Sequence, residues 1–471
     1  MSRSGRGQPD VLLIVLDTAR SFDVSTVWPD GPTTTPFLDS LAERSLVFPD
    51  ATTPSCWTLP GHASMFTGLL PSRHGAHELS MRLAPDGPPT LADLLRDAGY
   101  VTAGVSCNDL ITRSTGLTRG FDLFVEERDA VPSGLRGTTT ERVARRLPAL
   151  RRRLDARHAV HRMDGDHGGA RATRLAARLL RQVPRDRPLF FFVNYLESHL
   201  PYHPPEAMAR MYLPAGVDLA AARAVNQSSL DHHCGTVQHD ARDWEIMRAL
   251  YRAAVRYVDD LLRQFLDHVA ATRRLDDALL IVTSDHGENI GDHGLMDHQF
   301  SLHEQTLRIP LLVRLPGGEQ VARRGDLAQL IDLVPTVCEV AGIAAPATQG
   351  SSLLHAVDRE WTIAEYLAPH MVLAQLRSSR PEVDWTPYDR GLRAVRTRTR
   401  KLITASDGRN EMYEIDRDPF ELDNRYGSHP DEVRLARVLR TWEQSERAPA
   451  LGRQEMEPAV TERLAALGYI D

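Results

Sequence analysis

Three continuous apolar runs constrain the fold of this chain more than any other feature of its sequence. They are VLLIVL at residues 11–16, LFFFVNY at residues 189–195 and LLIVTS at residues 279–284. Each run has the length of a strand and lacks regular polar alternation, which is typical of parallel strands buried on both faces. The sequence therefore predicts an α/β fold in which helices cover both faces of a mainly parallel sheet.

Acidic and histidine side chains follow these runs. Asp17 comes directly after the first run, His199 soon after the second, and Asp285 and His286 directly after the third. Ligands of open α/β sheets bind at the carboxyl ends of the strands, so we expect Asp17, Asp285 and His286 to hold a divalent cation. Taken singly, Asp17 could equally be a helix N-cap, and a lone histidine is more often structural.

The segment PSCWTLPGHASMFTGLLPSRHG, residues 54–75, contains the predicted nucleophile. HASMFTGLL has a helical pattern, and Pro60 and Gly61 precede it, so Thr58 should lie at or just before a helix N-terminus. Backbone N–H groups at such a terminus favour an anion, and a hydroxyl beside a cation can attack an ester. The competing interpretation of Thr58 is an ordinary threonine N-cap.

Composition and charge narrow the classes of function. The net charge of −7 over 471 residues argues against a nucleic-acid partner. The only lysine is Lys401, so a Walker-type nucleotide site is excluded and a catalytic lysine is not expected. The four cysteines form no C-x-x-C pair, which argues against a disulfide scaffold or a cysteine-rich zinc site. Residues 11–16 are too few for a signal or membrane segment, so we expect a cytoplasmic protein without a membrane partner.

The order of patterns predicts a catalytic α/β domain over residues 8–355 and a C-terminal subdomain over residues 356–471, with antiparallel strands and terminal helices. Two variable insertions are expected in the first domain. The arginine-rich one, at about 130–187, should include a solvated amphipathic helix. The other, at about 206–245, contains DHHCGTVQHD, whose irregular histidine spacing favours a variable loop over a metal site.

Several motifs in this order resemble the sulfatase family of the alkaline phosphatase superfamily. They extend from about Asp10 to about Asn424 and are VLLIVLDTAR, TTPFLDSLA, PGHASMFTG, TLADLLRDAGYVTAG, LESHLPYHPP, TSDHGE, DHQFSLHEQTLRIPLLV, IDLVPTV and MYEIDRDPFELDN. The resemblance implies an alkaline-phosphatase-like sandwich, with a large, mainly parallel sheet between helices and a small C-terminal antiparallel sheet. It also implies an ester hydrolase with one divalent metal ion, Zn²⁺ or Mn²⁺ before Ca²⁺ or Mg²⁺.

Departures from the sulfatase pattern bear on the chemistry. Family sulfatases carry Cys-x-Pro-x-Arg or Ser-x-Pro-x-Arg, whose first residue is converted to formylglycine. Here Thr58 stands at that first position and His62 at the arginine, and a threonine cannot be oxidised to an aldehyde. His298 stands where many relatives carry a lysine, and Thr18 breaks the family's pair of aspartates after the first strand.

We therefore predict that Thr58 attacks the phosphorus of a small anionic phosphate ester, phosphodiester or phosphonate ester. The metal, helix N–H groups, Asn108 and His62 would stabilise the charged oxygens, and His199 or His298 would protonate the leaving oxygen. Two alternatives remain open. The same site could hydrolyse a sulfate ester, or the scaffold could serve as a biosynthetic transferase or bind an anion without turnover.

Overall fold

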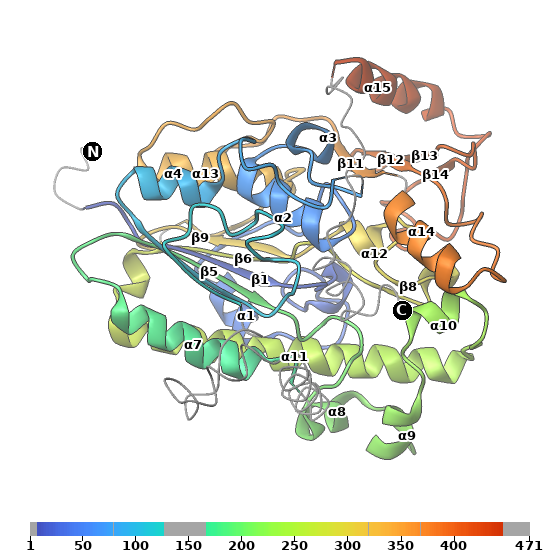
Figure 1. Cartoon of the computed structure of the whole chain (residues 1–471), viewed down its shortest axis with the longest axis horizontal. Helices are drawn as coiled ribbons and strands as arrows, with labels where there is room; N and C mark the ends of the chain where they lie inside the picture. Colours follow the sequence, from blue (N-terminus) through green and yellow to red (C-terminus); the bar gives the residue numbers. More distant parts are fainter. Residues whose placement is uncertain (1–6, 79, 127–165, 319, 368, 446–471) are drawn as a thin grey trace.

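The computed structural model describes residues 7–78, 80–126, 166–318, 320–367 and 369–445 (Figure 1). The described residues form an eight-stranded sheet in the order β10-β2-β9-β6-β1-β5-β3-β4. Among these strands, β9 alone runs opposite to its neighbours, and the other pairings are parallel. The strands are β1 (Val11–Leu16), β2 (Leu46–Val47), β3 (Val101–Ser106), β4 (Leu123–Glu126), β5 (Leu189–Tyr195), β6 (Leu279–Thr283), β9 (Leu311–Arg314) and β10 (Ala322–Arg323).

The three apolar runs are adjacent strands at the centre of this sheet, as expected. β1 pairs in parallel with β5 on one side and with β6 on the other. Side chains of β1 alternate between two hydrophobic cores: Leu13 and Val15 pack in one, and Leu12 and Ile14 pack in the other. Both faces of β1 are therefore covered, which is why the run is apolar at every position.

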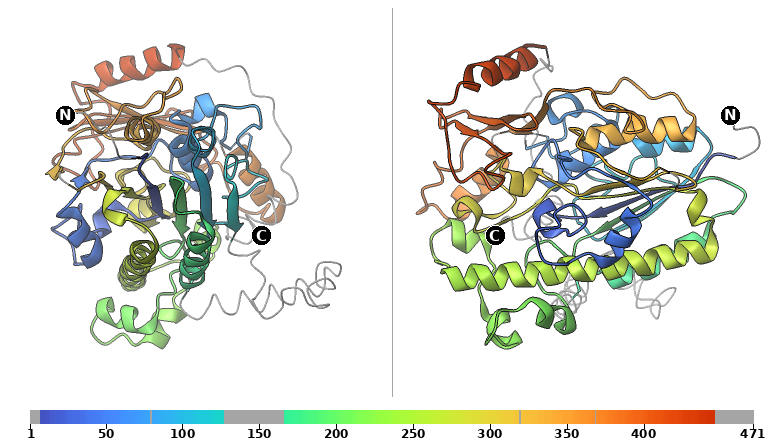
Figure 2. Two further views of the ribbon diagram at one scale, coloured as in Figure 1. Left: turned by 90° about the vertical axis from the view of Figure 1, so that its left-hand side faces the viewer. Right: turned by 180° about the vertical axis from the view of Figure 1, so that it is seen from behind.

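Helices form a layer on each face of the sheet, and Figures 1 and 2 show the two layers. One core contains residues of α2 (Thr58–Thr67), α4 (Leu91–Asp97) and α13 (Leu333–Ala341). The other core contains residues of α1 (Pro36–Ala42), α7 (Gly169–Gln182) and α11 (Ala241–Thr272). The predicted sandwich of a mixed, mostly parallel sheet between helices is confirmed.

The segment 206–245 differs from the expected variable loop, because it contains three short helices before α11 begins. These are α8 (Glu206–Tyr212), α9 (Leu219–Ala224) and α10 (Ser229–His233). The Asp218 side chain accepts a hydrogen bond from the Ala221 N–H and starts α9, and Ser228 starts α10 in the same way. Such short helices hold too few turns to show a hydrophobic period, so the sequence pattern missed them.

The arginine-rich insertion is described only in part. Its second piece is α7, whose apolar side chains Ala172, Leu175 and Ala176 are buried while Arg174 and Arg178 are exposed, so an amphipathic helix is confirmed. Residues 130–165 of this insertion lie outside the described residues. Of the helices that the structure describes, none is long and apolar enough to cross a membrane.

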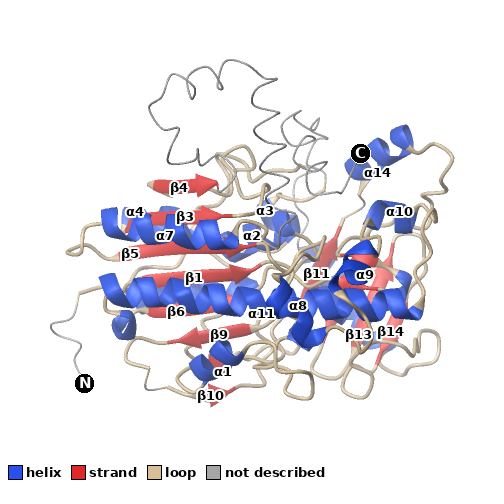
Figure 3. Cartoon of the chain, turned by 90° about the horizontal axis from the view of Figure 1, so that it is seen from below, coloured by secondary structure: helices blue, strands red, loops and turns tan. Residues whose placement is uncertain are grey.

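The C-terminal part contains the expected small antiparallel sheet, in the order β11-β12-β13-β14 (Figure 3). Its elements are β11 (Thr362–Tyr366), α14 (His370–Ser379), β12 (Leu392–Arg396), β13 (Lys401–Ala405), β14 (Glu411–Tyr413) and α15 (Glu432–Ser445). The buried Lys401 ammonium pairs with Glu304, 3.1 Å away in α12 (Glu304–Leu307), and with Glu421 at 2.9 Å. The sole lysine therefore fastens this sheet to the main body. The boundary at residue 355 stays a prediction.

Candidate active site

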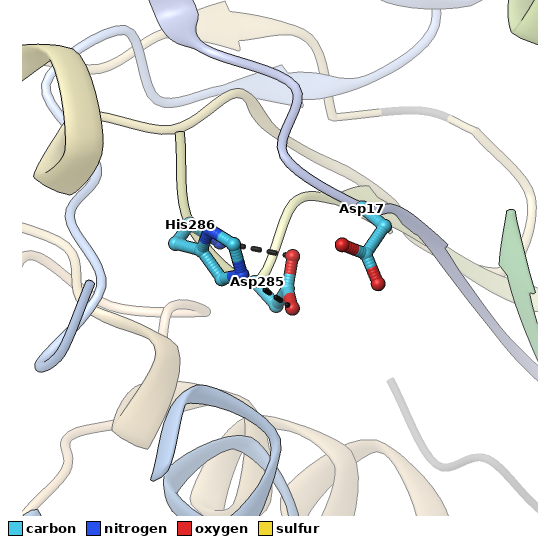
Figure 4. A group of neighbouring side chains, drawn as sticks. All are labelled: Asp17, Asp285 and His286. Carbon is cyan, nitrogen blue, oxygen red and sulfur yellow. Dashed lines mark hydrogen bonds and ion pairs between the residues drawn. The ribbon is translucent and has the colours of Figure 1, made fainter. Parts of the chain in front are cut away.

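Asp17, Asp285 and His286 meet at the carboxyl ends of the adjacent strands β1 and β6 (Figure 4). One potential ligand atom from each residue lies within 4.8 Å of the other two, and all three side chains are buried. Their meeting follows from parallel pairing, which brings the ends of strands far apart in the chain to one edge of the sheet.

Only one of the two oxygens of the Asp17 carboxylate accepts hydrogen bonds from described residues. Its Oδ2 accepts hydrogen bonds from Asn108 Nδ2 at 2.8 Å and from Asn194 Nδ2 at 3.0 Å. Its Oδ1 is buried and has no hydrogen-bond partner among the described residues. A buried carboxylate oxygen without a donor is costly unless a cation lies beside it, so this atom fits a metal ligand.

In Asp285, too, one carboxylate oxygen accepts hydrogen bonds from backbone N–H groups and the other does not. Oδ1 accepts hydrogen bonds from the backbone N–H of His286 at 3.0 Å and of Thr18 at 3.3 Å. Oδ2 lies 3.3 Å from His286 Nε2 and 3.3 Å from His62 Nδ1. Burial favours the neutral acid, but the neighbouring His286 and His62 outweigh it and hold the pKa of Asp285 well below its usual value. Asp285 is therefore ready to bind a cation as a carboxylate.

The Nε2 atom of His286 lies beside the Asp285 carboxylate and the Thr58 hydroxyl. Its Nδ1 lies 2.9 Å from the Gly287 carbonyl oxygen, which can only accept, so Nδ1 carries the proton. Nε2 is then the atom with a lone pair, and it lies 3.4 Å from the Thr58 hydroxyl oxygen as well as near Asp285. A backbone partner on the remote nitrogen is the usual way in which a metal-binding histidine is oriented.

Thr58 is the first residue of α2 and is completely buried. Its Oγ1 accepts a hydrogen bond from Asn108 Nδ2 over 3.2 Å and lies 3.4 Å from His286 Nε2. The helix approaches Asp285 closely at Gly61, where an added Cβ would lie only 2.9 Å from the Asp285 carbonyl oxygen. Glycine at this position therefore lets the helix N-terminus reach the strand end that carries Asp285.

His62 lies one helical turn after Thr58. Its Nδ1 is 3.0 Å from the Thr58 carbonyl oxygen and 3.3 Å from Asp285 Oδ2, and its ring makes edge contacts with Phe66 and Phe192. Burial lowers the pKa of His62, but the charge of Asp285 outweighs this and raises it. His62 thus contacts Asp285, one of the three candidate metal ligands.

His199 and His298 complete the predicted set. The His298 ring lies 4.2 Å from the His286 ring and 5.2 Å from the His199 ring, measured between centroids. His199 Nδ1 donates to the Leu200 carbonyl oxygen over 2.6 Å. Burial lowers the pKa of His298, but Asp297, 2.7 Å from its Nδ1, raises it well above the usual value. All the residues singled out from the sequence therefore lie in one cluster, while their catalytic roles stay predictions.

Sequence reasoning missed four side chains of this cluster: Asn194, Ser198, Glu288 and Asp297. Asn194 donates to Asp17 Oδ2, and the Ser198 hydroxyl donates to the Asp17 carbonyl oxygen over 2.5 Å. A signal for Asn194 was available, because it is the polar residue within the buried run of β5. Glu288 and Asp297 lie within the motifs TSDHGE and DHQFSLHEQTLRIPLLV, but neither directly follows a buried apolar run.

The donor set fits a divalent cation. Two buried carboxylates with oxygens that accept no hydrogen bond, one imidazole nitrogen and one hydroxyl surround the same point. A cation there would neutralise the charges of Asp17 and Asp285, whose burial is otherwise costly. Mixed nitrogen and oxygen ligands suit Zn²⁺ or Mn²⁺.

Comparison with known proteins identifies the family of this chain. Residues 9–343 match the sulfatase family, and residues 291–445 match the C-terminal family of N-sulphoglucosamine sulphohydrolase. The choline-sulfatase of Rhizobium meliloti (strain 1021) is 27% identical over 454 residues, covering 89% of this chain and 82% of that protein. The multifunctional alkaline phosphatase superfamily protein PehA of Trinickia caryophylli is 27% identical over 400 residues, covering 73% of this chain and 76% of that protein.

Solved structures share the fold. The phosphonate monoester hydrolase of Agrobacterium radiobacter superposes with a TM-score of 0.70 at 21% identity, covering 93% of this chain and 96% of that one. The structure of BT4656 in complex with D-glucosamine-2-N,6-O-disulfate superposes with a TM-score of 0.67 at 18% identity, with 93% and 98% coverage. Since the family match spans most of the chain, the protein belongs to the sulfatase family of the alkaline phosphatase-like superfamily and is an ester hydrolase.

Proposed function

We propose that this protein hydrolyses a small phosphate ester, phosphodiester or phosphonate ester, with Thr58 as nucleophile and a divalent cation held by Asp17, Asp285 and His286. The observation that carries the proposal is the position of the Thr58 hydroxyl. It lies 3.4 Å from His286 Nε2 and 3.2 Å from Asn108 Nδ2, at the start of a helix. Nucleophile, metal ligands and oxyanion donors would then act at one point.

The cation, when bound, would lower the pKa of the Thr58 hydroxyl and offset negative charge on the substrate. Asn108 holds the hydroxyl through Nδ2 and holds Asp17 through the same atom, so it couples nucleophile and ligand in one orientation. The oxygen of Thr58 forms a bond to phosphorus while the bond to the leaving alcohol breaks. Water then cleaves the phosphothreonine ester and restores the hydroxyl.

The helix N-terminus and two histidines would stabilise the negative charge of the substrate and protonate the leaving oxygen. The N–H groups at the start of α2 and the amide of Asn108 donate to the charged oxygens of the substrate. His298, held as an imidazolium by Asp297, adds positive charge where many relatives carry a lysine. His199 gives a proton to the leaving oxygen, with its ring oriented through the bond from Nδ1 to the Leu200 carbonyl.

A sulfate ester is the second candidate substrate, and the match to the sulfatase family favours it. Thr58 makes it the weaker one. A sulfatase with formylglycine releases sulfate by elimination from a hydrated aldehyde, and a sulfated threonine has no such route. Similarity to sulfatases therefore supports an ester-hydrolase scaffold, while the threonine at position 58 favours attack at phosphorus.

Parallel kinetics test the proposal. An aryl phosphate, a bis-aryl phosphate, an aryl phosphonate and an aryl sulfate with the same phenol are compared at saturating Mn²⁺ or Zn²⁺. The highest kcat/KM should be found for one of the phosphorus esters. A kcat/KM for the aryl sulfate above all three would replace the proposal with the sulfatase alternative. No turnover of any ester, by protein with bound metal, would favour transfer or anion binding.

A further inference from the structure

Two histidines of the segment 206–245 face each other outside the candidate active site. His232 belongs to α10, and His239 directly precedes Asp240, the residue that caps α11. The Nδ1 atoms of the two histidines are 3.2 Å apart, and both side chains are only half-buried. Folding therefore brings together two histidines of DHHCGTVQHD, although their spacing in the sequence follows no metal-binding motif.

The remote nitrogen of each ring has a partner that fixes the tautomer. His232 Nε2 donates to the Gly294 carbonyl oxygen over 3.1 Å, and His239 Nε2 donates to the Asn226 carbonyl oxygen over 2.7 Å. A carbonyl oxygen only accepts, so both Nε2 atoms carry a proton, and in the neutral rings both Nδ1 atoms have a lone pair. Two lone pairs at this separation repel each other unless a positive ion lies between them.

The surroundings of the pair favour a metal cation over a shared proton. Burial lowers the pKa of His232, the contact with the Gly294 carbonyl raises it in part, and a charge on His239 lowers it again. The ring of His232 is therefore neutral near pH 7, which is the form that binds metal. Two imidazole nitrogens bound at about 2.0 Å to a tetrahedral Zn²⁺ lie about 3.3 Å apart. The observed separation of 3.2 Å already has this value.

The side chain of Trp244, in α11, orients both rings. Its ring centroid lies 5.2 Å from that of His232 and 4.6 Å from that of His239. The indole also packs against Gly291, where an added Cβ would lie only 2.6 Å from it. The histidine pair is therefore held by the packing between α10, the first turn of α11 and the loop that begins at Gly291.

We propose that His232 and His239 bind a divalent transition-metal cation of the Zn²⁺ class through their Nδ1 atoms, with water completing the coordination. Imidazole nitrogen suits Zn²⁺, Cu²⁺ and Ni²⁺, whereas Mg²⁺ and Ca²⁺ prefer oxygen ligands. This site is separate from the group Asp17, Asp285 and His286, and its role is structural. The cation joins the end of α10 to the residue before the α11 cap.

α10 also contacts the candidate active site, beside the short strand β8 (Met296–Asp297) (Figure 1). Ser229 donates to Asp297 Oδ2 over 3.1 Å, and His233 Nε2 donates to the Met296 carbonyl oxygen over 3.0 Å. Asp297 Oδ1 lies in turn 2.7 Å from His298 Nδ1. A cation at the histidine pair should therefore fasten the segment that carries His298, and its removal should loosen that segment.

Metal content tests the inference without any assay of activity. Chelator-treated protein is brought to equilibrium dialysis against Zn²⁺, and bound metal is measured by elemental analysis. His232→Gln and His239→Gln should each bind one equivalent less than wild type. The double variant should also bind only one equivalent less, because one ion needs both rings. His268→Gln removes an exposed histidine of α11 and is the matched control, which should bind as much as wild type.

The same loss of one equivalent should be found in an Asp285→Asn background, which separates the histidine pair from the candidate active site. Zn²⁺ binding by both single variants equal to that of wild type would overturn the inference. Losses that add up in the double variant would also overturn it, since they would indicate two independent, adventitious histidine sites. Either result leaves the proposed ester hydrolysis intact.

A crystallographic measurement needs no variant. Anomalous diffraction at the zinc edge, from crystals of the wild-type protein soaked in Zn²⁺, should show a peak between the Nδ1 atoms of His232 and His239. Its distance to each nitrogen should be about 2.0–2.1 Å. Absence of this peak, in crystals that show one beside Asp285, would overturn the inference.

Discussion

Asn108 Nδ2 lies 3.2 Å from the Thr58 hydroxyl oxygen and donates to it, although the two residues come from different elements of the chain. The same nitrogen lies 2.8 Å from Asp17 Oδ2. Replacing Asn108 by Ala should therefore reduce kcat/KM by about 10²-fold, as for loss of one oxyanion donor. Asn108→Asp keeps the acceptor for the Leu110 N–H but places a negative charge beside Asp17, and should be at least as impaired. Steady-state kinetics with a thermal melt would check both; wild-type rates in either contradict the role.

Thr58→Ala should lower kcat by at least about 10²-fold, because the nucleophilic oxygen is gone. Thr67→Ala is a matched control at the other end of the same helix: Thr67 is equally buried, and its hydroxyl only donates to the Ala63 carbonyl. It should keep wild-type turnover per folded molecule. Acid quench during turnover should trap a covalent phosphoryl group, and mass spectrometry should locate it on Thr58. Full turnover by Thr58→Ala would refute Thr58 as the nucleophile.

Removal of metal should abolish activity and addition of Mn²⁺ or Zn²⁺ should restore it. The reason is that Asp17 and Asp285 otherwise place two buried carboxylates beside the reacting anion. Asp285→Asn should lower kcat about 10²-fold or more, and added metal should not rescue it. The measurement is ester hydrolysis after dialysis against a chelator and again after titration with each metal. Unchanged turnover in chelated protein whose metal content is zero would exclude a metal-dependent reaction.

Glu78 makes stability depend on pH. Burial raises its pKa from 4.5 to about 8, and its Oε1 accepts from Trp57 Nε1 over 2.6 Å. The folded state thus holds this proton more tightly than the unfolded state, so the stabilisation is complete below pH 4.5 and is lost as the pH rises through about 8. Glu78→Gln keeps the acceptor and should flatten the fall in the free energy of unfolding by up to about 1.4 kcal/mol per pH unit.

The measurement is urea unfolding of wild type and Glu78→Gln between pH 5 and pH 8, within the interval that the pKa of Glu78 defines. Glu206→Gln serves as the control, since Glu206 is exposed and pairs only with Arg210. The free energy of unfolding of Glu206→Gln should depend on pH in the same way as that of the wild type. Parallel slopes in Glu78→Gln and wild type would show that Glu78 is not the titrating group.

Lys401→Met should destabilise the protein by about 3 kcal/mol, because it leaves the Glu421 carboxylate buried without its cation, while Glu304 keeps its ion pair with Arg396. Glu304 and Glu421 lie 3.1 Å and 2.9 Å from the Lys401 ammonium, and all three side chains are buried. Chemical denaturation would measure the loss. Lys401→Arg, which keeps the charge, should lose less than Lys401→Met; equal stability of wild type and Lys401→Met would contradict this account.

Much of the fold was open to prediction because its strands are buried on both faces. β1, β5 and β6 follow the apolar runs almost to the residue. The helices of 206–245 were not predicted, since short helices started by a single capping side chain leave no periodic pattern. For the site, Asp17, Asp285 and His286 were found because they follow such runs, whereas Asn194, the polar residue within the run of β5, was overlooked.

The amino-acid sequence by itself determined which segments are strands, that acidic and histidine residues follow two of them, and that a threonine occupies the position before Leu59-Pro60-Gly61. Only the tertiary structure decided which oxygen of each carboxylate is held by a donor and which is left for a cation. It also decided that Glu288 and Asp297 share the His298 ring. The physical reason is that burial of a strand or helix produces a hydrophobic pattern that can be recognised in a short stretch of sequence. Hydrogen bonds and ion pairs form only between groups a few ångströms apart, and folding decides which distant segments come that close.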